Sequence, residues 1–155
     1  MIEKAPSAQY YKMTDCFPDV AYEFMSAFAR FEDALKRSGF LRNKRTAEAD
    51  WDGFARSLDK AFYEAIRNAP EASTLVGLPP KILDNSLSWI EGEPVTDAVT
   101  LFKALRRARN NLFHGNKFIG DPAGDERAKQ LLTESIWILN EASSQHEKIR
   151  RTISR

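Results

Sequence analysis

Apolar residues recur every three or four positions along most of the chain, which is the spacing of one face of an α-helix. Two such stripes predict helices at about residues 18–38 and 47–68. Pro18 suits the first turn of the first helix and Gly39 the position after its end, while Pro70 ends the second helix. The two stripes consist of Val20, Phe24, Phe28, Phe31 and Leu35, and of Trp51, Phe54, Leu58, Phe62 and Ile66.

Two more helices are predicted in the second half of the chain, at about residues 95–114 and 125–152. Gly115 stops the first of them, and residues 116–124 form a loop. No stretch shows the sustained alternation of apolar and polar residues that is typical of a half-buried strand. The pattern therefore predicts an all-α, four-helix, bundle-like fold. The apolar positions are Val95, Ala98, Val99, Phe102, Leu105 and Leu112 in the third helix, and Leu131, Leu132, Ile136, Trp137, Leu139 and Ile149 in the fourth.

Residues 71–93 are the least regular part of the chain, because glycines and prolines interrupt the apolar runs. A short helical turn is predicted at about residues 81–85. Trp89 and Ile90 are expected to fold back onto the core, because large apolar side chains gain most from burial.

The length of 155 residues predicts one domain, since domains usually contain about 100–200 residues. A content of 43% apolar and 29% charged residues is typical of a globular chain. Residues 1–15 are expected to form a mobile N-terminal arm, and residues 148–155 a basic C-terminal tail. The sequence thus predicts a single helical domain over residues 1–155.

Several classes of protein are excluded by what the sequence lacks. The sequence contains no run of 18 apolar residues, so no membrane span is predicted. The N-terminal segment does not resemble a secretory signal. Cys16 is the only cysteine, which excludes an intramolecular disulfide and fits a reducing cytoplasm. With one cysteine and two histidines, a zinc site is not expected, and no glycine-rich phosphate loop suggests a nucleotide cofactor. We therefore expect a cytoplasmic protein without membrane association, metal or cofactor.

Basic residues cluster along the chain although the net charge is only +1. Residues 36–45 and 101–120 each contain five basic residues and no acidic one, and residues 148–155 add four more. These segments can converge into a patch that attracts phosphates. Basic residues at the C-terminal ends of helices, where they suit the helix dipole, explain the first and last segments equally well.

Arg109 occupies an unusual position in the third predicted helix. It lies between Leu105 and Leu112 on the apolar face, and a buried guanidinium must be paired or serve a function. Alternatively, its long side chain reaches solvent from the edge of that face. Glu32 is a candidate acidic partner for Arg109, and a surface pair of Glu32 with Lys36 is the other interpretation.

The end of the third helix carries candidate catalytic chemistry. Arg106, Asn110 and His114 are spaced to share one face, and the negative end of the helix dipole favours a protonated His114. Histidine moves protons and arginine stabilises phosphoryl oxygens, which together suit phosphodiester chemistry. Arg109 lies about 140° from His114 on an ideal helix, so their convergence requires an unwound helix end or a second chain. The alternative is a histidine that only caps helix carbonyls.

The segment from Arg107 to Gly115 reads RARNNLFHG and resembles the signature of HEPN domains (higher eukaryotes and prokaryotes nucleotide-binding). That signature is an arginine, a polar residue such as asparagine, a short spacer and a histidine. In the family it lies at the end of the third main helix of an all-α bundle, where this sequence also has it. Residues 31–36 and the long last helix beginning near Arg127 are similar to the family as well. The resemblance implies an all-α, HEPN-type fold.

Many HEPN domains are metal-independent endoribonucleases of toxin–antitoxin, abortive-infection and CRISPR-linked systems, and they typically dimerise so that two motifs face one cleft. The resemblance implies that Arg109 and His114 are catalytic and that Asn110 orients them. The sequence departs from one subgroup, the HEPN toxins controlled by nucleotidyltransferase antitoxins, because their tyrosine two positions after the histidine is Asn116 here. Other HEPN domains keep the fold without the activity.

The sequence therefore predicts a metal-independent endoribonuclease of a toxin or phage-defence type. A ribose 2′-hydroxyl would attack the adjacent phosphate in a composite site of a homodimer. RNA is the expected partner, with an antitoxin or another defence-system protein as a further one. A non-catalytic helical module that binds RNA, a nucleotide or a partner protein is the alternative. The residues expected to support the site or bind RNA are Arg106, Asn111, Asn116, Lys117 and Glu32.

Overall fold

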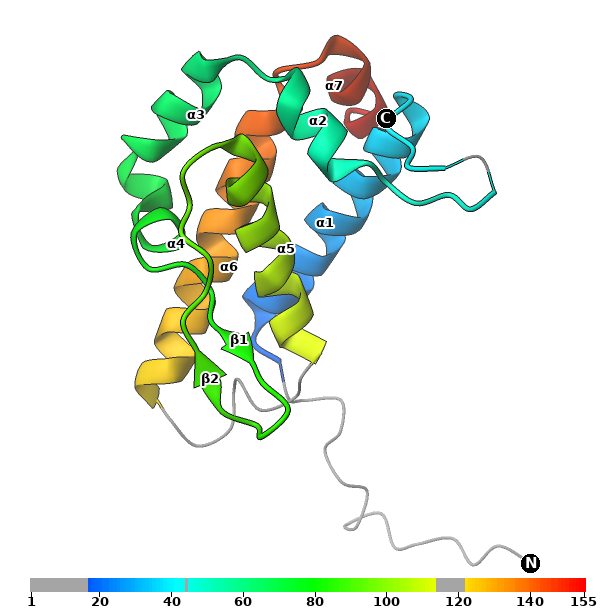
Figure 1. The fold of residues 1–155 in the computed structure, drawn as a ribbon. Coiled ribbons are helices and arrows are strands. Elements are labelled where there is room, and N and C mark those ends of the chain that lie inside the picture. Colours follow the sequence, from blue (N-terminus) through cyan, green and yellow to red (C-terminus); the bar gives the residue numbers. More distant parts are fainter. Residues whose placement is uncertain (1–16, 44, 114–121) are drawn as a thin grey trace, which may run out of the picture.

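The computed structural model describes residues 17–43, 45–113 and 122–155 (Figure 1). This part of the chain is mostly helical, as the sequence predicts, and its two strands form one short ribbon. None of the described helices is long and apolar enough to cross a membrane. The elements are α1 (Asp19–Arg37), α2 (Trp51–Ser57), α3 (Lys60–Arg67), the 3-10 helix η2 (Pro70–Ala72), α4 (Ser73–Gly77), β1 (Ile82–Leu83), β2 (Trp89–Ile90), α5 (Ala98–Phe113), α6 (Pro122–Ser143) and α7 (Glu147–Ile153).

The long helices α1, α5 and α6 form the centre of the fold (Figure 1). Helix α1 packs against α6 and α7, and α5 packs against α2 and α6. Phe54 of α2 joins two of the long helices, because its ring centroid lies 5.5 Å from that of Phe31 on α1 and 5.5 Å from that of Phe102 on α5. Burial of each such ring contributes about 1.5–3 kcal/mol to folding. The first predicted helix is confirmed, and its end at Gly39 has a φ of +93°.

The predicted helix at 47–68 is divided in the structure into α2 and α3. Leu58 has extended dihedral angles, and Asp59 begins α3 in an extended conformation. The Ser57 hydroxyl donates to the backbone oxygen of Phe54 at 2.6 Å. Serine side chains that bond to nearby backbone groups compete with helix continuation, which explains a break that apolar spacing does not reveal.

The predicted helix at 125–152 is also divided, into α6 and α7. The hydroxyls of Ser143 and Ser144 each donate at 2.7 Å to a carbonyl of the preceding turn, on Asn140 and Glu141. His146 then begins α7 with an extended backbone. As at Ser57, side-chain bonds to the backbone end the helix while the apolar period continues.

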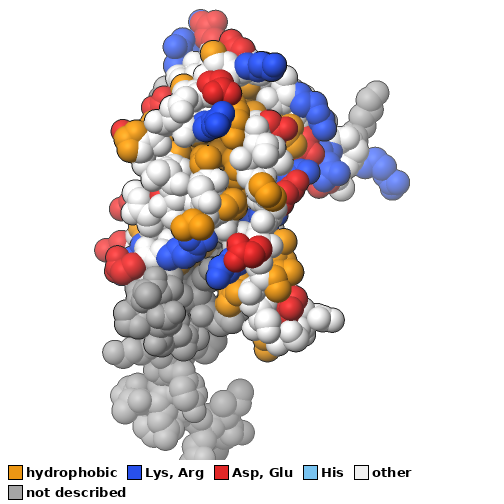
Figure 2. Space-filling view, turned by 60° about the vertical axis from the view of Figure 1, so that its left-hand side comes forward, with side chains coloured by type: hydrophobic (Ala, Val, Ile, Leu, Met, Phe, Trp, Pro, Cys, Tyr) orange, Lys and Arg blue, Asp and Glu red, His pale blue; other side chains and the backbone are white. Residues whose placement is uncertain are grey.

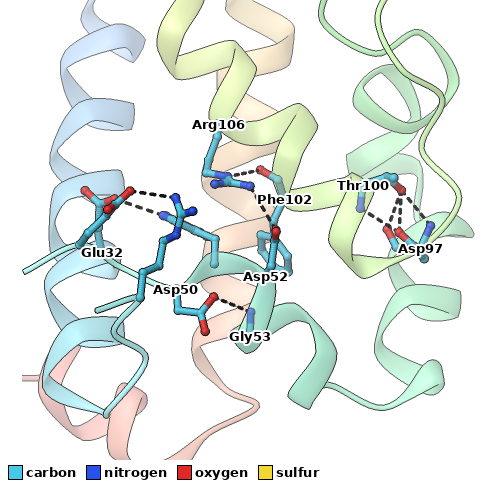
Figure 3. Close-up of polar contacts among 11 residues, drawn as sticks. Glu32, Asp50, Asp52, Gly53, Asp97, Thr100, Phe102 and Arg106 are labelled. Atoms are coloured by element: carbon cyan, nitrogen blue, oxygen red, sulfur yellow. Dashed lines mark hydrogen bonds and ion pairs between the residues drawn. The ribbon is translucent and has the colours of Figure 1, made fainter. Parts of the chain in front are cut away.

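Helix α5 begins at Ala98, three residues later than predicted, because Asp97 and Thr100 cap its first turn. The amide of Thr100 donates to Asp97 Oδ1 at 2.8 Å, and the amide of Asp97 donates to Thr100 Oγ1 at 3.0 Å (Figure 3). Thr100 Oγ1 also accepts from the amide of Thr96 at 2.8 Å. These bonds satisfy amide groups that have no partner within the helix. Hydrogen bonds donated by Thr100 hold the pKa of Asp97 below its usual value.

The predicted helical turn at 81–85 is wrong, because β1 and β2 form an antiparallel hairpin there. Ile82 faces Ile90 in the register, and the Asp84 carboxylate accepts from the amides of Ser86 and Ser88 at 2.9 and 3.0 Å. Aspartate side chains that bond to the following backbone favour turns over helix. Trp89 is half-buried and Ile90 is exposed, so Ile90 does not fold back onto the core as predicted. Figure 2 shows hydrophobic side chains exposed on this protruding part of the molecule.

The base of the hairpin is fastened to α5 and α6 by side chains that bond to its backbone. Arg107 on α5 donates to the oxygen of Pro80 at 3.4 Å. Arg127 on α6 donates to the oxygens of Leu78 and Pro79 at 2.7 and 3.1 Å. The hairpin therefore begins at a point fixed by both helices.

Candidate functional site

Arg109 and Asn110 lie side by side near the end of α5, and both are exposed. Arg109 Nη1 donates to Asn110 Oδ1 at 3.1 Å. An amide that accepts from a guanidinium restricts the directions in which the remaining guanidinium N–H groups can point. This contact fits the orienting role that the resemblance implies for Asn110.

Arg109 is exposed and does not face the core, which was one of the two interpretations of its place on the apolar stripe. Its guanidinium carbon lies 5.6 Å from the ring centroid of Phe28 on α1 and 5.0 Å from that of Phe113. Ala108 and Leu112 take the buried side of this turn. Arg109 therefore places its guanidinium beside two aromatic rings and remains exposed, which corresponds to the solvent-reaching interpretation.

Asn111 has a structural position rather than the predicted supporting position in the site. It is buried, with 4% of its surface exposed, and its side-chain amide donates to the backbone oxygen of Lys81 at 2.9 Å. Buried amides need such partners because an unpaired polar group is destabilising. Asn111 therefore holds the base of the hairpin and is not available to RNA.

A cavity of about 400 Å³ opens beside Arg109 and Asn110, between α1, α2, α5 and the segment that precedes α2. It is lined by basic side chains from two of the basic segments in the sequence, and Figure 2 shows basic side chains gathered along one edge of the molecule. The charge of the lining favours an anionic ligand. These basic residues are Arg42, Lys103, Arg106, Arg107 and Arg109.

The first and last basic segments differ in their positions. Arg42 of the first segment lines the cavity, whereas Lys36 and Arg37 occupy the last turn of α1. Arg150 and Arg151 of the last segment occupy the last turn of α7. The patch interpretation thus holds for part of the first segment, and the helix-end interpretation holds for these other residues.

Arg106 links α5 to α2 at one wall of the cavity. It forms an ion pair of 3.3 Å with Asp52, and its guanidinium carbon lies 5.9 Å from the ring centroid of Trp51 (Figure 3). Burial lowers the pKa of the Arg106 guanidinium, an effect that Asp52 opposes and the charge of Arg42 adds to. A guanidinium remains charged at neutral pH even so. Arg106 is therefore a fixed positive charge.

Glu32 also lines the cavity, but it has neither of the partners predicted for it. Its Oε1 accepts from Trp51 Nε1 at 3.1 Å. No ion pair with Arg109 or Lys36 occurs within the described residues. The contact with Trp51 was not predictable from the sequence, because apolar spacing assigned the Trp51 ring to the core without indicating where its N–H points.

Three of the predicted site residues, His114, Asn116 and Lys117, lie outside the described residues. The convergence of His114 with Arg109 therefore stays a prediction. Phe113, the residue before His114, is 62% exposed, so α5 carries the chain to solvent at this point. Within the part of the chain that the structure describes, no group of His, Cys, Asp and Glu side chains is arranged to hold a metal ion.

No protein-family model, curated protein or solved structure matches this chain. The residues around Arg109 and their chemistry are therefore the basis for inferring a function.

Proposed function

We propose that the protein is a metal-independent endoribonuclease in which Arg109, Asn110 and His114 form the catalytic group. The observation that carries this proposal is the exposed Arg109–Asn110 pair, which lines a cavity together with other basic side chains. Phosphate is the ligand that such a cavity suits best, because guanidinium groups bind phosphate oxygens through paired N–H donors. The HEPN-like segment that contains these residues extends the proposal to cleavage.

The proposed reaction is an internal transesterification. The 2′-hydroxyl of a ribose attacks the adjacent phosphorus, and the bond from phosphorus to the 5′ oxygen breaks. The products are a 2′,3′-cyclic phosphate and a free 5′-hydroxyl. His114 takes the proton from the 2′-hydroxyl or gives one to the leaving oxygen, and Arg109 offsets the charge that develops on the phosphoryl oxygens.

A second copy of the chain would supply the other half of this chemistry. With two His114 side chains in one composite site, one can act as the base and the other as the acid. We therefore propose a homodimer with Arg109 and His114 near its two-fold axis. Sedimentation at high micromolar concentration tests this part, and a monomer there would contradict it.

The size and walls of the cavity are compatible with part of an RNA strand. Sites for small ligands usually measure about 300–1,000 Å³, and the volume of about 400 Å³ falls within that range. Single-stranded RNA is the form expected, since its bases are free to enter a pocket and stack on guanidinium planes. A role as a toxin or phage-defence effector in the cytoplasm, with an antitoxin or other defence-system protein as partner, is part of the proposal.

The test is cleavage of a single-stranded RNA by the purified protein in excess EDTA. His114→Ala is expected to reduce the rate by about 10²–10⁴-fold, the usual contribution of one general acid or base. Arg109→Ala is expected to lose about 10²–10³-fold. Arg67→Ala is a matched control, because Arg67 is exposed on α3, forms an ion pair with Glu64 of the same helix and does not line the cavity. Activity that disappears with chelation, or that survives both site substitutions, would show the proposal to be wrong.

A module that binds RNA without cutting it is the second candidate function. It is favoured by the basic cavity, because a cavity of this charge can bind RNA without any catalytic contribution from His114. The two functions separate in the same experiment, because a binding module would retain the RNA and release no cyclic phosphate.

A further inference from the structure

Glu32 is an unusual side chain in a cavity that otherwise attracts phosphate. The other two acidic residues at this place are paired, Glu48 with Arg42 at 2.9 Å and Asp52 with Arg106 at 3.3 Å. Among the described residues Glu32 forms no ion pair, although it lines the same cavity as Arg42 and Arg106. A carboxylate without an ion-pair partner repels phosphate, so its presence suggests a different part of the ligand.

The orientation of the Glu32 carboxylate is fixed by Trp51. The indole N–H occupies one acceptor position of Oε1, and the buried Trp51 ring is held between Phe28 and Phe31 at centroid distances of 5.2 and 5.4 Å. A carboxylate has about four acceptor positions, and within the described part of the chain the bond from Trp51 is the one hydrogen bond that the Glu32 carboxylate accepts, which leaves acceptor positions for a ligand. Figure 3 shows Glu32, Asp52 and Arg106 contributed by α1, α2 and α5.

The surroundings of Glu32 suit a nucleobase. Phe28 lies one turn earlier on α1, and the Arg109 guanidinium lies 5.6 Å from the Phe28 ring centroid. The guanidinium of the exposed Arg109 side chain therefore lies about one helical turn from the carboxylate, between contacts to Phe28 and to Phe113 at 5.0 Å. Unpaired RNA bases are recognised by stacking on aromatic rings and guanidinium groups and by hydrogen bonds to their Watson–Crick edges.

We propose that the Glu32 carboxylate, oriented by Trp51, selects guanine in the RNA strand that enters this cavity. Guanine presents two parallel donors on its Watson–Crick edge, N1–H and the 2-amino group, and a carboxylate accepts both. Cytosine and adenine each offer one amino group beside an acceptor nitrogen, and uracil offers one N–H between two carbonyl oxygens. On those bases an acceptor atom would face the carboxylate, and two acceptors cannot form a hydrogen bond with each other. This inference deepens the proposed function and rests on its RNA-binding part.

The experiment measures binding without cleavage. The probes are fluorescein-labelled 2′-O-methyl pentanucleotides, UUGUU and the same strand with inosine replacing guanine. The methyl groups remove the attacking hydroxyl, and inosine lacks only the 2-amino group. The wild-type protein is expected to bind the guanine strand about tenfold or more tightly than the inosine strand, since hydrogen bonds to charged groups are among the strong ones.

Glu32→Gln is expected to abolish this discrimination while keeping an acceptor for Trp51, because a glutamine that pairs with N1–H and O6 ignores the 2-amino group. Glu48→Gln is the matched control, since it removes the same charge from the same cavity and should leave the discrimination unchanged. Glu32→Asp, which withdraws the carboxylate by one methylene, should reduce the discrimination and covers the case in which Glu32→Gln does not fold.

Equal binding of the two strands by the wild type, or discrimination that survives Glu32→Gln, would overturn the guanine assignment. Absence of binding to either strand would overturn it together with RNA binding. Discrimination against inosine without cleavage of the ribose strand would uphold the assignment and refute the nuclease proposal, so the two failures are distinguishable.

Discussion

Asn111 of α5 donates a hydrogen bond from its side-chain amide to the backbone oxygen of Lys81, 2.9 Å away, at the base of the hairpin. The two residues before it in the chain face elsewhere, Arg109 over the Phe28 ring and Asn110 toward Arg109. Three consecutive polar residues therefore divide between an accessible site and the internal structure. Two adjacent asparagines offer a direct comparison of these roles.

We expect Asn111→Ala to lower the free energy of unfolding by about 1–3 kcal/mol, because the buried Asn111 side chain is lost and the partly buried Lys81 oxygen loses its partner. Asn110→Ala is the matched control and should change stability by less than about 0.5 kcal/mol, since Asn110 is exposed. Urea denaturation measures both. Equal destabilisation by the two substitutions would contradict the division.

Gly92 lies where the chain leaves the hairpin and passes close to its beginning. A Cβ atom at this position would lie 2.2 Å from the backbone oxygen of Pro80 and 3.0 Å from Arg107 Nη1. We expect Gly92→Ala to lower the free energy of unfolding by about 1–3 kcal/mol, because a backbone atom must move. Gly77→Ala is the control, since a Cβ there meets nothing within 4 Å. A thermal melt of Gly92→Ala that matches the wild type would be inconsistent with this packing.

Asp97 gives the start of α5 a dependence on pH. The bonds from Thr100 lower the folded-state pKa of Asp97 below its ordinary value of 3.8. Its stabilising contribution is therefore complete above about pH 5 and declines as the pH falls through 3.8 toward the folded-state pKa. At neutral pH we expect Asp97→Ala to lower the free energy of unfolding by about 1 kcal/mol, and at pH 3 by less.

Urea denaturation at the two pH values measures this effect. Asp59→Ala is the control, because Asp59 begins α3 without a side-chain capping bond and should matter less. A loss for Asp97→Ala that is as large at pH 3 as at pH 7 would refute the pH dependence.

Arg109→Lys tests whether the proposed site requires the shape of the guanidinium or only its charge. Lysine keeps the charge but lacks the planar fork that binds two phosphate oxygens at once. We expect the rate of RNA cleavage to fall about 10²-fold while the salt dependence of RNA binding stays near that of the wild type. Arg67→Lys on α3 should change neither quantity. Full activity in Arg109→Lys would assign the residue a purely electrostatic role.

The sequence predicted the helical class and the first helix because Phe24, Phe28 and Phe31 repeat at helical spacing. The prediction is confirmed for these residues, which are all buried. It did not predict the breaks at Leu58 and after Ser143, where serine hydroxyls bond to the backbone while the apolar period continues. These breaks depend on local hydrogen bonds, which apolar periodicity does not represent.

The candidate site was predictable to a similar degree. The RARNNLFHG segment predicted Arg109 and Asn110 as site residues and charge clustering predicted a basic patch, and both residues line the cavity together with basic side chains. The helical spacing left open whether Arg109 faces the core or reaches solvent, and it left Asn111 in the predicted site. Spacing gives the direction of a side chain but does not tell whether another element covers that turn, and here the hairpin covers Asn111 at Lys81.

The hairpin has a consequence for local opening. It contains only two residue pairs, Ile82 with Ile90 and Leu83 with Trp89, and two-stranded hairpins of this kind are marginally stable alone. The bonds from Arg107, Asn111 and Arg127 reach the chain before β1, so they hold the base of the hairpin and not its two strands. Backbone amides of residues 82–90 should therefore exchange with deuterium through a local opening, well before those of Leu101 and Leu105 in α5, whose exchange requires unfolding of the core.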